Sequence, residues 1–162
     1  MAIRPILTWP DPRLSQPCAP IGPEQVAALA ADLLDTMYAA PGRGLAAPQL
    51  GQLCRLFVMD TTWKEAAPCP RVIANPEILW RSDEVAAGPE GCLSIPGITA
   101  EVTRAKAIRL RWQDAQGAVQ DEVLTGMEAI CAQHEYDHLD GIVTFDRLPP
   151  ETRAALIAEY TA

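Results

Sequence analysis

Prolines and glycines interrupt this sequence at short intervals, and this spacing limits what the chain can fold into. Fifteen prolines and ten glycines occur in 162 residues. Proline lacks a backbone donor and glycine adopts turn conformations readily, so both tend to end regular elements. Long repeats and coiled coils are therefore not expected. With 49% apolar and 21% charged residues, the chain can still build a hydrophobic core. Its length predicts one domain over residues 1–162.

The charge balance and the cysteines argue against several classes of protein. Thirteen basic and 21 acidic residues give a net charge of -8, whereas nucleic acids and anionic membranes bind basic surfaces. No apolar run approaches the roughly 18 residues of a membrane span, and the first residues lack the apolar segment of a signal peptide. Five cysteines without a CxxC pair are untypical of a disulfide framework. We expect a cytoplasmic protein with no nucleic-acid site and no membrane contact.

Three segments have the pattern of helices. Pro23–Ala39 has apolar residues at three- and four-residue steps after a proline that suits the first turn. Thr125 and the glutamate three residues later form a capping-box pattern before a helix that runs to about Leu139. Gly141 follows as a left-handed end to that helix. Glu151–Tyr160 is expected to form a terminal helix.

Short aliphatic or β-branched runs separated by proline and glycine predict strands between the first two helices. They are Leu56–Met59, Arg71–Ala74, Ile98–Thr103, Ala107–Trp112 and Val119–Leu124. The last two runs flank Asp114-Ala115-Gln116-Gly117, which is typical of a hairpin turn. The order of the elements predicts an α+β fold: an N-terminal helix, short and mainly antiparallel strands, a central helix and a C-terminal helix.

The central helix contains the only two histidines of the chain, in His134-Glu135-Tyr136-Asp137-His138. Residues four apart on a helix lie one above the other, about 5–6 Å apart at Cβ. Two imidazoles in this arrangement can bind one metal ion, and the intervening Glu135 can lie beside the open side of the metal. The alternative is a pair of ordinary core or surface histidines.

A catalytic metal site of this kind needs a third protein ligand and keeps one position for water. Two candidates follow from the residues alone. Glu159 lies downstream but close to the chain end, where fraying would weaken a ligand. Cys92 follows Gly91, which allows close backbone approach, and a metal would hold its thiol as thiolate. A closed, purely structural site would need a fourth ligand such as Cys131, and the chain would then be a non-catalytic binding module.

The glycine-rich run Gly42–Gln49 lacks the lysine and hydroxyl residue of a nucleotide-binding loop. A tight, closely packed turn would explain it. Alternatively, Gln49 could present an amide donor to an oxygen that gains negative charge during a reaction.

Several segments together resemble the peptide deformylase family, and specifically its Gram-negative-type branch. Three of them match the signature motifs of that family in order and spacing: Gly42–Gln49, Glu90–Ser94 and Gln133–His138. The resemblance extends from about Ile6 to Leu148 and includes Asp11-Pro12-Arg13-Leu14 and Asn75-Pro76. It implies a hydrolase that removes the N-formyl group from formyl-methionine at the start of newly made polypeptides and releases formate.

The resemblance assigns the metal ligands. Cys92 would be the third ligand beside His134 and His138. Fe(II) is the typical metal of the family, and Zn(II), Ni(II) or Co(II) can substitute. Glu135 would be the general base toward the attacking water and then the acid toward the leaving amine.

The resemblance also places the substrate. Gln49 and the backbone N–H of Leu93 would donate to the formyl oxygen. Gly44 and the neighbouring backbone would pair with the peptide as an added strand. Glu90 belongs to the same site, and we expect it to pair with Arg104 behind the metal.

Four further points follow for substrates and partners. Met127, Ile130 and Cys131 border the helix face of His134 and could hold the methionine side chain, although ordinary core packing would also explain them. Arg43 replaces an aliphatic residue of the family; it could narrow the site, contact an anion or point to solvent, and could mark a paralogue with altered substrate preference. The acidic residues of Glu151–Tyr160 give little support to ribosome contact. A metal endopeptidase would share the helix motif.

Overall fold

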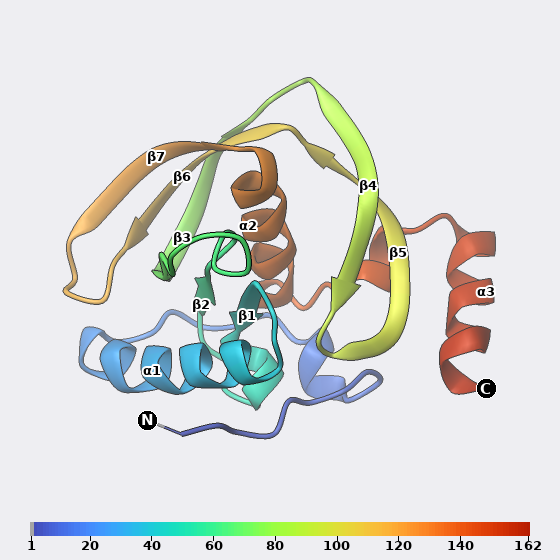
Figure 1. Cartoon of the computed structure of the whole chain (residues 1–162), viewed down its shortest axis with the longest axis horizontal. Coiled ribbons are helices and arrows are strands. Elements are labelled where there is room, and N and C mark those ends of the chain that lie inside the picture. Colours follow the sequence, from blue (N-terminus) through green and yellow to red (C-terminus); the bar gives the residue numbers. More distant parts are fainter. Residues whose placement is uncertain (1) are drawn as a thin grey trace.

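Helix α2 (Gly126–Leu139) packs against both sheets of the fold in the computed structural model, which describes residues 2–162 (Figure 1). The larger sheet has the strand order β1-β2-β3-β6-β7, and all neighbours are antiparallel. Its strands are β1 (Gly44–Ala46), β2 (Leu56–Met59), β3 (Arg71–Arg81), β6 (Ala107–Gln113) and β7 (Val119–Thr125). The smaller sheet pairs β4 (Val85–Cys92) with β5 (Ile95–Ala105). The fold is therefore α+β, as the sequence predicts.

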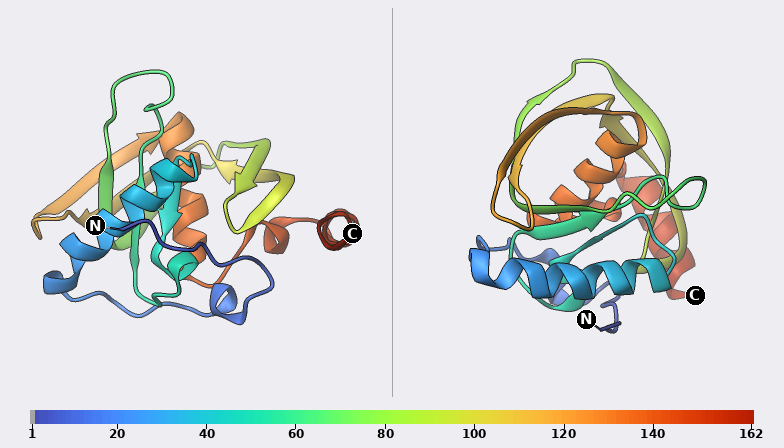
Figure 2. Two further views of the ribbon diagram at one scale, coloured as in Figure 1. Left: turned by 60° about the horizontal axis from the view of Figure 1, so that its bottom comes forward. Right: turned by 60° about the vertical axis from the view of Figure 1, so that its left-hand side comes forward.

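Two further helices complete the structure. Helix α1 (Pro23–Ala39) packs against β1 and β2, and α3 (Pro150–Thr161) lies at the periphery beside β5 (Figures 1 and 2). Short 3-10 helices cover Pro12–Ser15, Ala47–Leu50 and Thr144–Arg147. None of the helices in the described part of the chain combines the length and apolar character needed to cross a membrane.

Buried apolar side chains hold α2 in place. Phe57, Leu110 and Leu139 are fully buried in the layer between α2 and the larger sheet. A second apolar group, which includes Leu33 of α1, fills the space between α1 and the first two strands. Because both layers meet at β1 and β2, these strands are covered from two sides, and all four residues of β2 are buried.

The structure confirms the predicted helices but not the predicted cap of α2. Helix α1 has the predicted bounds, and α2 begins directly after Thr125. However, the Thr125 side chain makes no cap hydrogen bond, so the capping box is wrong. Glu128 instead accepts a hydrogen bond of 2.9 Å from Arg71 of β3. A charged partner competes successfully with the neutral backbone group because charge-assisted hydrogen bonds are the stronger kind.

The strand predictions are confirmed where residues favour β structure and incomplete elsewhere. The hairpin of β6 and β7 has the predicted turn, with Gly117 at φ 82°. β3 and β5 are longer than predicted, and neither β4 nor the short β1, which lies in the run expected to form a turn, was predicted. β4 consists of Val-Ala-Ala-Gly-Pro-Glu-Gly-Cys, and alanine, glycine and proline are depleted in strands. Pairing with β5 along its whole length overrides that preference.

Gly141 provides a stability test of this fold. Its φ is +76°, and a Cβ there would lie 2.8 Å from the backbone carbon of Ser15. Gly117 has a similar φ of +82° but no atom within 4 Å of the added carbon. We expect Gly117→Ala to cost about 1–2 kcal/mol from backbone conformation. Gly141→Ala should cost at least about 1 kcal/mol more because the backbone must also shift.

Urea denaturation of the two variants beside the unmodified protein measures both losses. Equal losses for Gly141→Ala and Gly117→Ala would contradict the tight contact between the end of α2 and the segment at Ser15.

Candidate metal centre

Helix α2 brings the two histidines together. His134 and His138 are one turn apart, their ring centroids lie 5.0 Å apart, and the rings meet at 70°. Both side chains are buried, His138 almost completely. The helix begins and ends where the sequence places it, so the spacing of the motif translates directly into this geometry.

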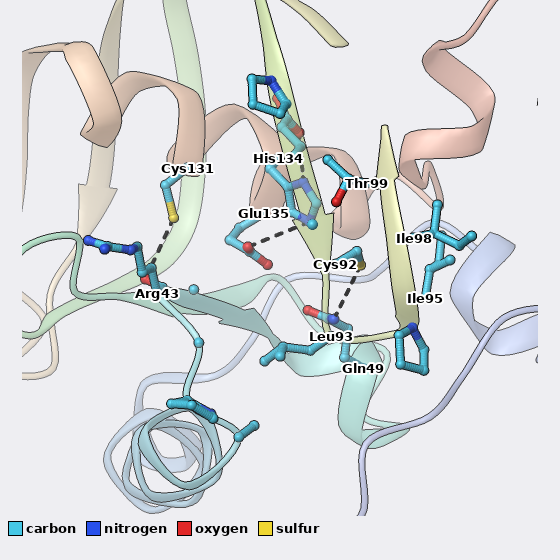
Figure 3. Close-up of a pocket in the computed structure, with 18 of the residues that line it drawn as sticks. Arg43, Gln49, Cys92, Leu93, Ile95, Ile98, Thr99, Cys131, His134 and Glu135 are labelled. Carbon is cyan, nitrogen blue, oxygen red and sulfur yellow. Dashed lines mark hydrogen bonds and ion pairs between the residues drawn. The ribbon is translucent and has the colours of Figure 1, made fainter. Parts of the chain in front are cut away.

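Cys92 approaches the histidines from the other side, at the end of β4. Its Sγ lies 3.5 Å from Nε2 of His138, and one ligand atom from each of Cys92, His134 and His138 lies within 4.8 Å of the others. In the close-up, Cys92 and His134 face the same space between α2 and the hairpin of β4 and β5 (Figure 3). One thiol and two imidazoles fit a catalytic metal site of three protein ligands.

Glu90 fixes the orientation of the His134 ring. Its Oε1 lies 2.9 Å from Nδ1 of His134 and accepts a hydrogen bond of 2.9 Å from Nη2 of Arg104, while its Oε2 accepts one of 2.9 Å from Nε of Arg104. Because Nδ1 is occupied, Nε2 of His134 is left for a metal. The expected pair of Glu90 and Arg104 is confirmed. Both carboxylate oxygens of Glu90 are engaged within the protein, so Glu90 supports the site from behind.

Arg104 extends this network to helix α2. Its Nη1 donates to Asp137 at 2.7 Å, and Arg147 donates to the same carboxylate at 2.7 and 3.0 Å. Arg104 is 7% exposed and Asp137 is 4% exposed. The network was not predicted beyond Arg104, although Asp137 lies inside the histidine motif.

The buried charges shift the pKa values of the site. Burial alone would raise the pKa of Glu90, but hydrogen bonds from His134 and Arg104 lower it to about 2. Burial, and then the nearby charges of His134 and Arg104, lower the pKa of His138 well below 6.5. A neutral imidazole is the form that ligates a metal. For His134 burial is outweighed by Glu135, Cys92 and Glu90, which raise its pKa; a bound cation would replace that proton and balance the same negative groups.

Glu135 lies beside the three ligand residues and has one free oxygen. Its Oε2 lies 3.9 Å from Nε2 of His134, and its Oε1 is buried without a hydrogen-bond partner among the described residues. Burial raises the pKa of Glu135 to about 7, although the charge of His134 opposes the shift. Buried polar atoms are normally paired. A carboxylate that has an unpaired oxygen and a pKa of about 7 is suited to proton transfer.

Gly44 explains why the glycine-rich run passes so close to this carboxylate. A Cβ at Gly44 would lie 2.7 Å from Oε2 of Glu135 and 2.8 Å from Sγ of Cys131. Only glycine therefore lets β1 lie against α2 at this point. β1 is also the edge strand of the larger sheet, with one side unpaired.

Gln49 and Leu93 lie next to Cys92. The Gln49 side chain is buried, and its Oε1 accepts from the Ala46 backbone at 2.9 Å. Its Nε2 donates to Ser94 at 2.9 Å and lies 3.9 Å from Sγ of Cys92 (Figure 3). Leu93 follows Cys92 in the two-residue turn between β4 and β5. The contact with Ser94, which holds the amide, was not predicted.

A cavity of about 780 Å³ opens in front of these groups. The predicted side chains Met127, Ile130 and Cys131 line it from α2, together with His134 and Glu135. The predicted residues Arg43, Gly44, Gln49, Glu90, Cys92 and Leu93 line it from the strands and turns. All the predicted site residues except His138 therefore line this one cavity. His138 lies behind His134.

The Arg43 side chain is directed away from the cavity centre (Figure 3). Its guanidinium donates to the backbone oxygen of Thr61 and pairs with Glu65 at 2.5 and 3.1 Å. The Arg43 guanidinium is therefore not directed freely into solvent but contacts an anion of the protein itself, the Glu65 carboxylate. The sequence comparison with the family did not predict that Arg43 would bind Thr61 and Glu65.

The alternative ligands do not join the group. Glu159 is exposed on α3, and the thiol of Cys131 donates to the backbone oxygen of Arg43 at 3.7 Å. In residues 2–162, the group that could hold a metal consists of Cys92, His134 and His138 alone. The site therefore lacks a fourth protein ligand, as a catalytic rather than a structural centre requires.

This fold and site define a metal-dependent hydrolase with a carboxylate beside the metal position. The family model of polypeptide deformylase matches residues 3–154, so the chain belongs to the peptide deformylase family. A peptide deformylase of Afipia carboxidovorans is 44% identical over 99% of this chain and 95% of that protein. One of Alkalilimnicola ehrlichii is 48% identical over 91% of this chain and 83% of that protein.

Solved structures agree with this assignment. The crystal structure of a peptide deformylase from Legionella pneumophila has a TM-score of 0.91 at 38% identity, and the match covers 99% of this chain and 94% of that one. A peptide deformylase from Ehrlichia chaffeensis in complex with actinonin also has a TM-score of 0.91, at 33% identity over 98% of this chain and 96% of that one. The enzyme class is a metal-dependent amidohydrolase.

The metal content of cysteine variants tests the ligand set. We expect about one divalent ion per chain in the unmodified protein, and a loss of most of it in Cys92→Ala. Cys131→Ala should keep its ion because its thiol lies outside the ligand group. Elemental analysis after anaerobic purification measures both. Loss of metal in Cys131→Ala, with retention in Cys92→Ala, would instead indicate a different ligand set.

Proposed function

We propose that this chain hydrolyses the N-formyl group of formyl-methionine at the start of newly made polypeptides, with Glu135 as the proton carrier beside a metal held by Cys92, His134 and His138. The observation that carries the proposal is the buried Glu135 carboxylate, which has an unpaired oxygen at the edge of the cavity. Family membership supplies the reaction. The products are formate and a free amine, and the substrate places the activity in the cytoplasm.

The donor set supports one divalent ion per chain. When bound, such an ion acts as a Lewis acid that lowers the pKa of water and polarises a carbonyl oxygen. One thiolate and two imidazoles suit several ions. We propose Fe(II) as the ion in the cell, with Zn(II), Ni(II) and Co(II) able to substitute.

Glu135 can move the proton that hydrolysis requires. In its ionised form it accepts a proton from the attacking water, and in its protonated form it donates that proton to the leaving amine nitrogen. The raised pKa, to about 7 because of burial, makes both forms accessible near neutral pH. Because Oε1 of Glu135 has no hydrogen-bond partner among the described residues, it can accept or donate a proton without breaking a hydrogen bond within the protein.

Two donors are available for the formyl oxygen as it gains negative charge. Nε2 of Gln49 donates to Ser94 at 2.9 Å and lies 3.9 Å from Sγ of Cys92, so the amide is held beside the position where the formyl oxygen would bind. The backbone N–H of Leu93 lies in the adjoining turn. Donors held rigidly in this way stabilise developing charge without reorganisation during the reaction.

The peptide can extend the larger sheet. β1 is the edge strand of the larger sheet, and its first residue, Gly44, lines the cavity. A peptide bound as an added strand gains main-chain hydrogen bonds regardless of sequence. Met127, Ile130 and Cys131 then provide apolar surface for the methionine side chain, and Cys131 also packs against the core.

Two finer points concern partners and substrate preference. Helix α3 carries one basic residue, Arg153, which lies 3.5 Å from Asp146, and it exposes Glu151 and Glu159. This pattern gives little support to ribosome contact through α3.

A paralogue with altered substrate preference is the second candidate function, because Arg43 replaces an aliphatic residue at the edge of the site.

Glu135→Gln tests the assigned role. The amide cannot carry the proton, so we expect formate release from formyl-Met-Ala-Ser to fall by roughly 10²–10⁴-fold. Metal content and thermal unfolding should stay close to those of the unmodified protein. Formate release at the unmodified rate would show that another group moves the proton.

The blocking group of the substrate separates deformylation from endopeptidase activity. Formyl-Met-Ala-Ser should release formate, whereas acetyl-Met-Ala-Ser and the unblocked peptide should stay intact, because an acetyl methyl group crowds the donors at Gln49 and Leu93. Mass spectrometry of the three reactions measures the outcome. Cleavage between residues of the acetylated peptide would support an endopeptidase instead.

A further inference from the structure

Lys64 is a charged side chain at the entrance of the cavity for which the reaction has no use. It is exposed and belongs to the residues that line the cavity. None of the ion pairs in the described part of the chain includes it. Of the other charged lining groups, Glu90 is paired with Arg104 and Glu135 is buried, and Arg43 is paired with Glu65. Lys64 therefore leaves an uncompensated positive charge where substrate enters.

The segment that carries Lys64 is fixed to the residues beside β1. The indole Nε1 of Trp63 donates to the backbone oxygen of Gly42 at 2.9 Å, and the Trp63 ring packs edge-on against Tyr38 at 5.2 Å. The Lys64 Nζ lies 5.7 Å from the centre of the Trp63 ring, within the range of a cation–π contact. These contacts hold the ammonium group near the strand edge.

Arg43 secures the same segment on its other side. Its guanidinium binds the backbone oxygen of Thr61 and the carboxylate of Glu65, so the chain is held both before and after Lys64. The pairing also occupies the carboxylate of Glu65, which follows Lys64 in the chain. One arginine thus both anchors the segment and leaves the lysine unpaired.

We propose that Lys64 makes the enzyme prefer peptides with a carboxylate in the residues that follow the formyl-methionine. The inference rests on the proposed function. A peptide added to the edge of β1 runs beside Gly44 and therefore close to Gly42 and Arg43, the residues to which the Lys64 segment is tied. Its next side chains then come within reach of a long and flexible lysine. The carboxylate can be an acidic side chain or the free C-terminus of a short peptide.

Isosteric peptides test this preference. The substrates are formyl-Met-Glu-Ser and formyl-Met-Ala-Glu, both as C-terminal amides, each beside its glutamine counterpart. At low ionic strength we expect a higher kcat/KM for the glutamate form of at least one pair, by about twofold to fivefold, which is the size of an exposed charge contact. The ratio should fall toward one in 0.5–1 M NaCl, where the screening length is only about 3–4 Å.

Substitution of each of the two lysines assigns the effect. Lys64→Gln should remove the Glu-to-Gln preference, and Lys64→Arg should retain it. Lys106→Gln is the matched control, because Lys106 is exposed and pairs with Glu84 outside the cavity. An equal preference in Lys64→Gln and the unmodified protein, or no preference in the unmodified protein, would overturn the proposal.

Two further comparisons complete the design. Arg43→Met should weaken the preference although Lys64 is still present; an unchanged ratio would overturn the positioning role of Arg43. Free-acid and amidated formyl-Met-Ala-Ser distinguish the C-terminal carboxylate from a side chain as the partner. If no peptide releases formate, the proposed function itself fails, whereas normal release with equal Glu and Gln rates overturns the role of Lys64 alone.

Discussion

The site depends on one buried arginine that joins two parts of the fold. Arg104 lies on β5 and binds Glu90 of the neighbouring strand and Asp137 of α2 at distances between 2.7 and 2.9 Å. The hairpin that carries Cys92 is therefore tied to the helix that carries both histidines. Removing one partner from a buried ion pair leaves an uncompensated charge and costs about 3–5 kcal/mol. The same bonds hold the Glu90 carboxylate against His134, so stability and ligand orientation have a common origin.

The charges around the metal position follow a consistent order from the back of the site to its front. Glu90 and Asp137 are bound by arginines, so they position other groups. Glu135 faces the cavity without such a partner, and burial raises its pKa to about 7. These carboxylates therefore take different roles because their surroundings differ. At the entrance Arg43 pairs with Glu65, and Lys64 takes part in none of the ion pairs among residues 2–162.

Much of this arrangement could be predicted from the sequence because local patterns determine it. The amphipathic spacing of α1, the start of α2 and the turn at Gly141 need no knowledge of the tertiary fold. The histidine spacing on α2 predicts one half of the metal site in the same way. Cys92 lies more than 40 residues earlier in the chain, and no local rule brings it to the histidines. Residue chemistry alone made Cys92 the stronger candidate but left Glu159 open, and the family resemblance decided for Cys92.

The incorrect or missing predictions have a shared physical cause, which is pairing between distant segments. β4 forms from residues that do not favour strands because β5 supplies partners along its length. Glu128 pairs with Arg71 instead of capping α2, and the guanidinium of Arg43 binds a segment about 20 residues away.

X-ray absorption spectroscopy of the protein loaded with one zinc ion tests the central claim most directly. The account predicts one sulfur at about 2.3 Å, two imidazole nitrogens at about 2.0–2.1 Å, and a fourth light atom from solvent. Two sulfurs, or four ligands all from the protein, would contradict it.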